Sequence, residues 1–209
     1  MRSALHRIFF CLLSTAILLG TLFCNSVWQM NRNISREVFR LHILANSDSP
    51  RDQALKLKVR DRILSDWGFL FAESPDAKSS AEIAGQYAPF LRQTAQAELR
   101  RQGCLAPVSV KIARDSFPTK AYGGVRLPAG QYTALRIQIG AAAGQNWWCV
   151  LYPPLCLTGG ALQADAETLR KLRQELTPEE YALVTETESL QVKMKFRLAE
   201  ILGRRNINR

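Results

Sequence analysis

The stretch VFRLHILANSDSPRDQALKLKVRDRIL, residues 38–64, changes its periodicity half-way along and decides the class of fold. Its first part, residues 38–45, is rich in β-branched and large apolar residues, which favours a strand. Because side chains alternate along a strand, Arg40 and His42 share one face. The other face is expected to carry Phe39, Leu41 and Ile43. We therefore expect His42 to be a half-exposed strand residue and not a ligand or a catalytic base.

A helix is expected directly after this strand. Ser49 is a favourable N-cap, Pro50 fits the first helical position, and Asp52 completes a shortened capping box. Asp48 and Asp52 could form an acid pair, but both complement the positive N-terminus of a helix, and capping is the simpler interpretation. The buried face of the helix is expected to consist of Leu55, Val59 and Ile63.

The chain downstream predicts a second helix and further strands. Residues 76–102 carry a helical apolar stripe, which Pro89 would either kink or split. The proline and glycine of residues 127–130 indicate a hairpin, whose return strand follows directly. The segments that predict strands by alternation or by continuous apolar character are residues 108–114, 132–139 and 147–152.

These elements predict an α+β fold in a single domain. We expect an antiparallel sheet with the two early helices packed mainly on one face. The sheet would be made mainly of residues 38–45, 108–114, 120–139 and 147–152. The core domain would comprise residues 38–157. A helical appendage is expected over residues 158–188, with a second capping box at 177–180, and a strand and short helix over residues 189–209.

The N-terminal segment, residues 1–26, predicts export. Arg2 and Arg7 lead into an apolar run of about 17 residues, close to the ~20 that span a bilayer. Small residues at 24–26 suit cleavage, so the segment is either a cleaved signal peptide or an uncleaved membrane anchor. Because positive charge stays on the cytoplasmic side, both alternatives place the rest of the chain outside the cytoplasm.

The segment NWWCVLYPPLC, residues 146–156, contains two of the chain's five cysteines. Outside the cytoplasm thiols tend to pair, and the proline pair between Cys149 and Cys156 lowers the entropy of closing the loop. A disulfide there would stabilise the fold by roughly 2 to 3 kcal/mol. Zinc would need two further ligands, whereas the exported part offers only His42 and Cys104, and a catalytic thiol would need a partner base. We predict a disulfide, no metal or cofactor, and a buried or unpaired thiol at Cys104.

The chain is basic, with 28 Lys and Arg against 18 Asp and Glu and a formal net charge of +10. Without Arg2 and Arg7 the exported part keeps +8 (10 minus 2). In the cytoplasm this charge would suggest nucleic acid as a partner. Outside, the available polyanions are lipid head groups and cell-wall polymers. We therefore expect either attraction to an envelope surface or a merely solvated basic surface, and no nucleic-acid partner.

Four blocks of the sequence resemble one protein family. They are LHILANSDSPRDQALKLKVRD at 41–61, SFPTKAYGG at 116–124, LPAGQYTALRIQIG at 127–140 and QNWWCVLYPPLC at 145–156. Together with the N-terminal signal, and in this order, they are similar to stage II sporulation protein R of endospore-forming bacteria. His42 stands where that family commonly has an arginine, and residues 158–188 contribute little to the resemblance.

The resemblance implies a function in signalling. Members of the family are made in the forespore and exported into the space between forespore and mother cell. Their partner is a membrane-embedded aspartic protease of the mother cell, which then removes the inhibitory pro-sequence from the precursor of sigma E. The resemblance thus implies a protease activator that acts by binding and is not itself an enzyme. The sequence agrees, since it contains no G-x-S-x-G, no H-E-x-x-H and no phosphate-binding glycine loop.

Candidate contacts with such a partner lie in the family-like blocks, and each has a structural alternative. Tryptophan and tyrosine often carry interface energy. For the tryptophans the alternative is core packing around the disulfide, and for Asp48 and Lys120 it is cap and turn chemistry. The candidates are Asn46, Asp48, Lys120, Tyr122, Trp147 and Trp148.

A different class of function remains open from the sequence, namely a basic envelope-binding module or a hydrolase of the cell wall. A hydrolase would need two carboxylates roughly 5 to 9.5 Å apart in a cleft. The carboxylates available for such a pair are Asp48, Asp61, Glu98 and Asp115.

Overall fold

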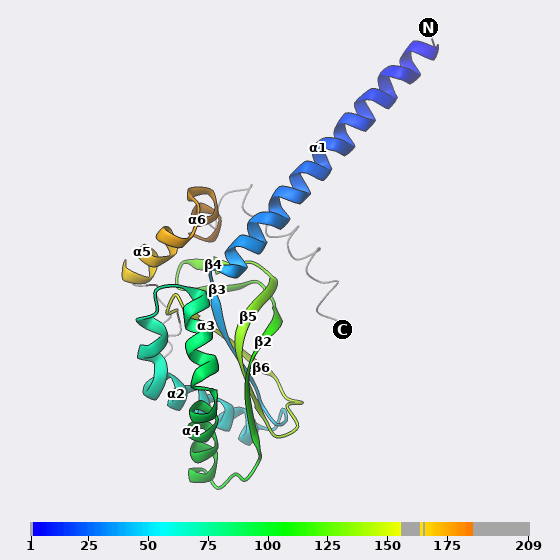
Figure 1. Ribbon diagram of the computed structural model, residues 1–209. Helices are drawn as coiled ribbons and strands as arrows, with labels where there is room; N and C mark the ends of the chain where they lie inside the picture. Colours follow the sequence, from blue (N-terminus) through cyan, green and yellow to red (C-terminus); the bar gives the residue numbers. More distant parts are fainter. Residues whose placement is uncertain (1, 156–163, 165, 186–209) are drawn as a thin grey trace.

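A computed structural model describes residues 2–155, 164 and 166–185 as a long N-terminal helix attached to one α+β domain (Figure 1). The helices are α1 (Arg2–Arg36), α2 (Pro50–Ala72), α3 (Ala77–Gln86), α4 (Ala88–Arg101), α5 (Ala166–Glu175) and α6 (Pro178–Thr185). The strands are β1 (Phe39–Leu44), β2 (Val108–Phe117), β3 (Lys120–Tyr122), β4 (Val125–Leu127), β5 (Gly130–Ile139) and β6 (Asn146–Tyr152). The predicted fold class is therefore confirmed.

The main sheet has four strands in the order β2-β5-β1-β6. Pairing is antiparallel between β2 and β5 and between β1 and β6, as expected, but β1 runs parallel to β5. Parallel strands need a long crossover, and here α2, α3, α4, β2, β3 and β4 lie between the two strands in the chain. The sheet is thus mixed, and the expectation of a purely antiparallel sheet was wrong for this one pairing.

Residues 120–127 do not join the main sheet, contrary to our expectation. They form a separate two-stranded ribbon, in which β3 pairs with β4. The turn of this ribbon lies at Gly123 and Gly124, both with positive φ, which two-residue hairpins require. The turn predicted at 127–130 instead leads from the ribbon into β5, and β5 pairs with β2.

One face of the main sheet, which we call the helix face, is covered by α2, α3 and α4. The register sets Leu41 beside Leu135 and Ile43 beside Ile137, so that apolar side chains of neighbouring strands lie together. These residues form one buried cluster with the predicted apolar face of α2 and with side chains of α3 and α4. Helix packing on this face, as well as the strand faces predicted for β1, is confirmed.

The opposite face, called the outer face, is partly covered by a second apolar cluster. Buried residues of this cluster come from the end of α1, from the β3–β4 ribbon and from α5 and α6. Leu172 and Val184 are completely buried. Side chains of α5 and α6 therefore pack against the domain, and the division into a core domain and a helical appendage stays a prediction. The strand and helix expected over residues 189–209 lie outside the described residues.

The predicted helix starts are confirmed. Ser49 caps α2 and its hydroxyl accepts a hydrogen bond from the Asp52 amide at 3.1 Å. In the capping box of α6, the Glu180 amide donates to the Thr177 hydroxyl at 3.3 Å, and the Thr177 amide donates to the Glu180 carboxylate at 3.0 Å. The helix predicted over 76–102 is split between α3 and α4, and Pro89 lies in the first turn of α4, where a proline is tolerated.

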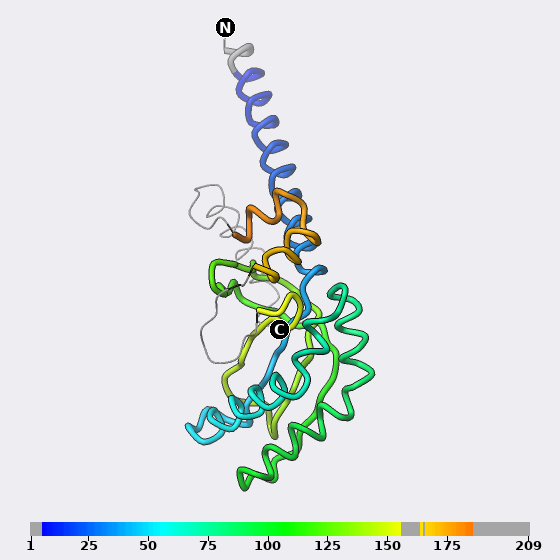
Figure 2. Tube along the Cα trace, turned by 90° about the vertical axis from the view of Figure 1, so that its left-hand side faces the viewer, coloured from blue at the N-terminus to red at the C-terminus, as the bar shows by residue number. Residues whose placement is uncertain are grey.

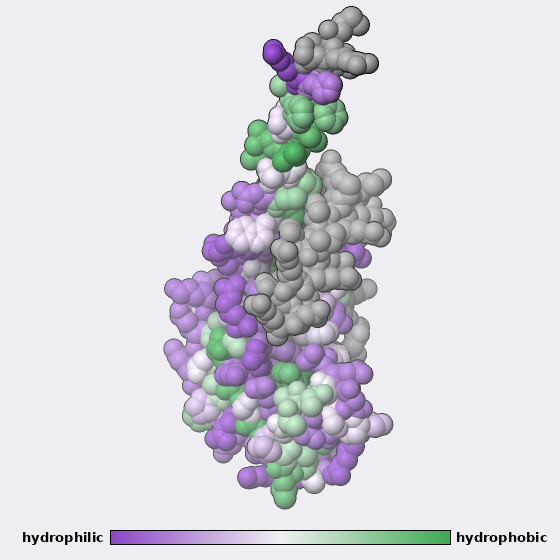
Figure 3. Space-filling model, turned by 90° about the vertical axis from the view of Figure 1, so that its right-hand side faces the viewer, coloured by the Kyte–Doolittle hydropathy of each residue, from purple (hydrophilic) through white to green (hydrophobic). Residues whose placement is uncertain are grey.

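Helix α1 has two parts with different surroundings. From Ile8 to Phe23 its large apolar side chains are exposed, and Figure 3 shows them gathered on the part that projects from the domain. Near its end, Val27 and Ile34 are buried against the domain. In the described chain this is the one helix long and apolar enough to cross a membrane. The N-terminal segment is thus compatible with a signal or an anchor.

Candidate interaction site

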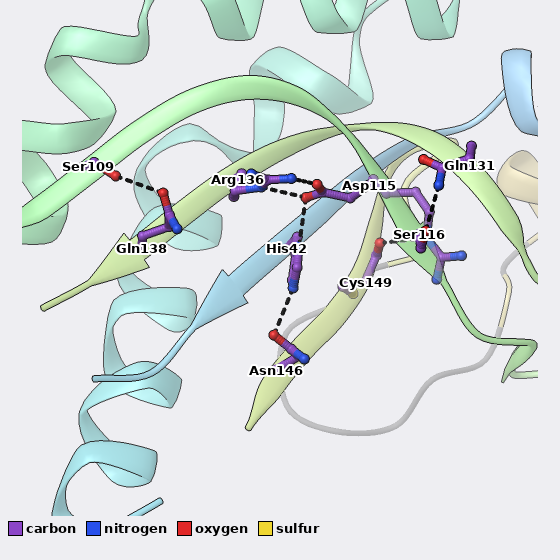
Figure 4. A network of polar contacts seen from close by, with 10 residues as sticks. His42, Ser109, Asp115, Ser116, Gln131, Arg136, Gln138, Asn146 and Cys149 are labelled. Atoms are coloured by element: carbon purple, nitrogen blue, oxygen red, sulfur yellow. Dashed lines mark hydrogen bonds and ion pairs between the residues drawn. The ribbon is translucent and has the colours of Figure 1, made fainter. Parts of the chain in front are cut away.

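A polar network crosses all four strands of the main sheet on its outer face. His42 of β1 donates from Nδ1 to Asp115 Oδ2 of β2 at 2.7 Å, and its Nε2 lies 2.9 Å from the Asn146 side-chain amide of β6 (Figure 4). Arg136 of β5 completes the network, since its Nε donates to Asp115 Oδ2 at 2.8 Å. The network ties the strands together through side chains as well as through the backbone.

His42 is buried, with 8% of its surface exposed, so the expectation of a half-exposed residue was wrong. Its ring stacks on Trp148, with centroids 6.3 Å apart, and meets the edge of Phe117 at 5.7 Å. Burial lowers the pKa of His42, and the charges of Arg136 and Arg40 act in the same direction, whereas the hydrogen bond with Asn146 raises it. Burial therefore favours the neutral form of the ring over the protonated form.

Arg40, two residues before His42, is completely buried on the same face. Its guanidinium lies 4.1 Å from the ring centre of Phe117 and 4.8 Å from that of Tyr132, which is cation–π geometry. It donates from Nη2 to the Tyr122 hydroxyl at 2.5 Å and from Nε to the Cys149 carbonyl at 3.3 Å. Within the described residues its Nη1 has no hydrogen-bond partner. In the described part of the chain, this cation is thus held by aromatic rings and not by carboxylates.

Three of the predicted contact residues come together beside Arg40. The Tyr122 hydroxyl donates to the Trp148 carbonyl at 3.2 Å, and Lys120 Nζ lies 5.8 Å from the Trp148 ring centre. Tyr122 is buried, Trp148 is half-buried and Lys120 is exposed. A partner at this place could therefore meet Lys120 and the rim of Trp148, while Tyr122 would support them from beneath.

Trp147 points to the helix face, away from its neighbour Trp148. It packs against the first apolar cluster, and the Arg60 guanidinium of α2 lies 4.3 Å from its ring centre. The core-packing alternative therefore describes its contacts. Among the described residues the indole nitrogen atoms of Trp147 and Trp148 are both buried without a hydrogen-bond partner.

Asn46 and Asp48 brace a loop between β5 and β6. Asn46 Oδ1 accepts a hydrogen bond from the Ala141 amide at 2.9 Å, and Asp48 Oδ1 accepts one from the Gln145 amide at 2.6 Å. Asn46 also donates to the Asp52 carboxylate at 2.8 Å. Both side chains thus have structural tasks, and their role as partner contacts stays a prediction.

Four of the five cysteines lie in the described part of the chain. Cys149 is disulfide-bonded, while Cys11, Cys24 and Cys104 are free. Cys104 was expected to be buried or unpaired, and it is half-buried and free. The predicted partner of Cys149, Cys156, lies outside the described residues, so this pairing stays a prediction.

The carboxylates considered for a hydrolase each have a basic or backbone partner. Asp61 lies 2.6 Å from Arg60 and Glu98 lies 2.9 Å from Arg101, whereas Asp115 is held by Arg136. Asp61 and Glu98 line the same shallow depression between α2 and α4. Asp115 belongs to the outer face and Asp48 to the loop region. The four are therefore not assembled into one site.

The sequence did not predict that Arg136 and Asn146 lie in one polar network with His42. It also did not predict the buried position of Arg40 next to this network. Alternation alone places Arg40 and His42 on one face of β1 and Arg136 on one face of β5. The missing information is the register that sets His42 beside Arg136 and brings Asp115 within reach. That register becomes visible only once strand order is known.

Comparison with known proteins identifies the family. A model of the stage II sporulation protein R family matches residues 35–161. The chain belongs to this family. It is 35% identical over 149 residues to stage II sporulation protein R of Bacillus subtilis (strain 168), a match that covers 68% of this chain and 66% of the relative, just under two thirds of its length. No solved structure matches the chain.

Family membership supports a role in sporulation signalling. The residues matched by the stage II sporulation protein R family run from the end of α1 to beyond β6. They include the whole main sheet, the β3–β4 ribbon and the polar network of His42, Asp115, Arg136 and Asn146. The domain that carries the candidate contacts is therefore the part that the family shares.

Proposed function

We propose that this chain is exported from the forespore and activates, by binding, a membrane-embedded aspartic protease of the mother cell that processes the precursor of sigma E. The family match over the sheet domain carries this proposal. Activation requires only that the chain bind the active state of the protease more tightly than the inactive state. The chain would act without chemistry of its own, and it would do so in the space between the two membranes.

The form of α1 supports export. Arginines precede its exposed apolar part, so the helix would insert with its N-terminus in the cytoplasm and deliver the domain to the other side. Leu18 and Leu19 lie in the middle of that part and are 58% and 62% exposed. They contact bilayer, not protein, in this arrangement.

The proposal is tested by producing the full chain together with the protease and its precursor substrate in a host that does not sporulate. Cleavage of the precursor is measured by immunoblot. We expect it to rise when the chain is present. A matched variant, Leu18→Arg with Leu19→Arg, puts two charges at the centre of the apolar run, where each costs several kcal/mol, and should abolish the rise.

Two results would count against the proposal. Precursor cleavage that does not change when the chain is present would remove the activating role. Digestion of purified cell wall by the chain alone, with no protease added, would favour the hydrolase alternative.

A further inference from the structure

An aromatic cluster joins α2 to the start of α4, with Trp67 half-buried and with Tyr87 and Phe90 exposed. The ring of Trp67 in α2 is 5.6 Å from that of Tyr87 and 6.4 Å from that of Phe90 in α4, and the last two rings are 6.0 Å apart. The Trp67 indole donates to the Thr94 hydroxyl at 3.1 Å, which fixes the orientation of the ring. The cluster is therefore ordered before any partner binds.

The cluster is exposed although it is apolar. Phe90 is 55% and Tyr87 is 37% exposed. Two adjoining depressions share Phe90, Gln93 and Ala97: one of about 430 Å³ lies between α2 and α4, and one of about 530 Å³ lies on α4 alone. Together they form a groove along α4. Contiguous apolar surface in a groove is typical of a site that another molecule covers.

The groove is lined by more positive than negative charge. Arg62 pairs with Asp66 at 2.9 Å, and Arg101 pairs with Glu98 at 2.9 Å. Arg92 and Arg100 line the second depression, and neither forms an ion pair with any carboxylate in the described part of the chain. These two guanidinium groups are free to bind carboxylates of a partner, and arginine does so with two parallel hydrogen bonds.

The groove lies far from the projecting helix. Figures 1 and 2 both show α4 ending at the extremity of the domain opposite α1. If α1 lies in the membrane across which the chain is exported, this end of the domain points away from that membrane. A flat bilayer surface also fits a concave groove poorly, so the geometry favours a protein partner.

From these observations we propose that the groove between α2 and α4 is the docking site for an acidic segment, bearing apolar side chains, of the partner protein. This inference rests on the proposed function, in that the partner is the protease of the opposite membrane. An apolar side chain of the segment would cover Phe90 and Trp67. Its carboxylates would pair with Arg92 and Arg100. The site differs from the contacts predicted in the sequence, since none of those six residues lines it.

The test uses the full chain with two variants in the groove and two matched controls. Phe90→Ser removes the exposed ring, and Phe69→Ser removes a ring of α2 that is equally exposed, at 54%, but points to another side of the helix. Arg92→Glu inverts a charge in the groove, and Arg170→Glu inverts an exposed charge on α5. Circular dichroism and thermal unfolding should show all four variants folded, because each changed side chain lies on the surface.

We expect Phe90→Ser and Arg92→Glu to reduce cleavage of the precursor by roughly ten-fold when the chain is limiting, which corresponds to about 1.4 kcal/mol of binding free energy. Both controls should retain the cleavage of the unchanged chain. A photo-reactive benzoylphenylalanine at position 90 should cross-link to the protease, whereas the same group at position 69 should not.

The possible failures are distinguishable. If the unchanged chain does not stimulate cleavage, the proposed function fails. If it does stimulate cleavage but the groove variants equal their controls, the docking site is wrong and the function stands. Cross-linking from position 90 only to lipid, or only to a second copy of the chain, would also overturn the docking site.

Discussion

Arg40 is a cation that the fold buries completely among aromatic rings, and no carboxylate of the described residues forms an ion pair with it. We expect Arg40→Lys to destabilise the fold by about 2–4 kcal/mol, because an ammonium keeps the buried charge but cannot stack on the rings. Arg40→Met removes the charge and keeps much of the apolar stem, so it should cost at least about 1 kcal/mol less. Urea unfolding of the purified chain in detergent micelles measures both. Equal losses would show that an unstacked buried charge at this place carries no penalty beyond the loss of the guanidinium.

His42 should make stability depend on pH. Because burial lowers its pKa in the folded state, the unfolded chain binds a proton at higher pH, near the ordinary value of about 6.5. Below that value the unfolded state holds more protons, so stability falls as the pH drops below about 6.5 and levels off below the folded-state pKa. We expect thermal unfolding between pH 5 and pH 7.5 to show a shallower dependence in His42→Gln.

The matched control for this pH effect is His6, the second of the two histidines, which is exposed on α1. His6→Gln should keep the full pH dependence of the unchanged chain. A His42→Gln variant with the same profile as His6→Gln would mean that other groups cause the dependence.

For single residues, the sequence predicted on which face of a strand a side chain lies, but not which other side chains contact it. Alternation correctly placed Arg40 and His42 on one side of β1, but it could not show that Phe117 and Trp148 cover them. These covering residues come from β2 and β6, far away in the chain. Exposure is a property of tertiary packing, so a local pattern cannot determine it.

Among the elements, the loop between β5 and β6 is held tightly against the turn that leads into α2. The Gly144 amide donates to the Ala45 carbonyl at 3.0 Å, and a Cβ atom on Gly144 would overlap the backbone oxygen of Ser47. Backbone cannot move aside as a side chain can, so we expect Gly144→Ala to destabilise the fold by about 1–3 kcal/mol. Chemical unfolding of the purified chain measures the change.

Gly68 provides the control for this loop, because it lies inside α2 and has open space where a Cβ atom would stand. Gly68→Ala should stabilise the fold by about 0.5–1 kcal/mol, since alanine is the better helix former. If both substitutions changed stability in the same direction, the close approach of the loop to Ser47 would not explain the effect of Gly144→Ala.

The elements themselves were largely predictable, but their pairing was not. Ser49 and Thr177 mark helix starts through local hydrogen bonds, which a sequence pattern encodes directly. The parallel neighbours β1 and β5 are separated in the chain by α2, α3, α4, β2, β3 and β4, and no local sequence pattern predicts that these two strands pair. The groove between α2 and α4 was missed for the same reason, because Trp67 and Phe90 meet only through helix packing.

For the whole molecule, α1 joins an exposed apolar segment to the domain without a flexible break. Its exposed apolar part and its buried end belong to one continuous helix, Arg2–Arg36, and Ile34 is completely buried in the second apolar cluster. The end of α1 is therefore part of the domain core, whereas the large apolar side chains in the middle of α1 are exposed and lie outside that core. The two parts should then respond differently to the same substitution.

We therefore expect Ile34→Ala to destabilise the domain by about 2–4 kcal/mol, as removal of a buried aliphatic side chain usually does. Leu19→Ala, at a site that is 62% exposed, should change unfolding of the domain by less than about 0.5 kcal/mol. It should instead weaken retention of the chain in the membrane fraction, since alanine buries less apolar surface in the bilayer. Chemical unfolding in detergent micelles and membrane fractionation separate the two effects. Equal unfolding of both variants would mean that the end of α1 does not pack on the domain, and the helix would then be only a leader to a domain that begins at β1.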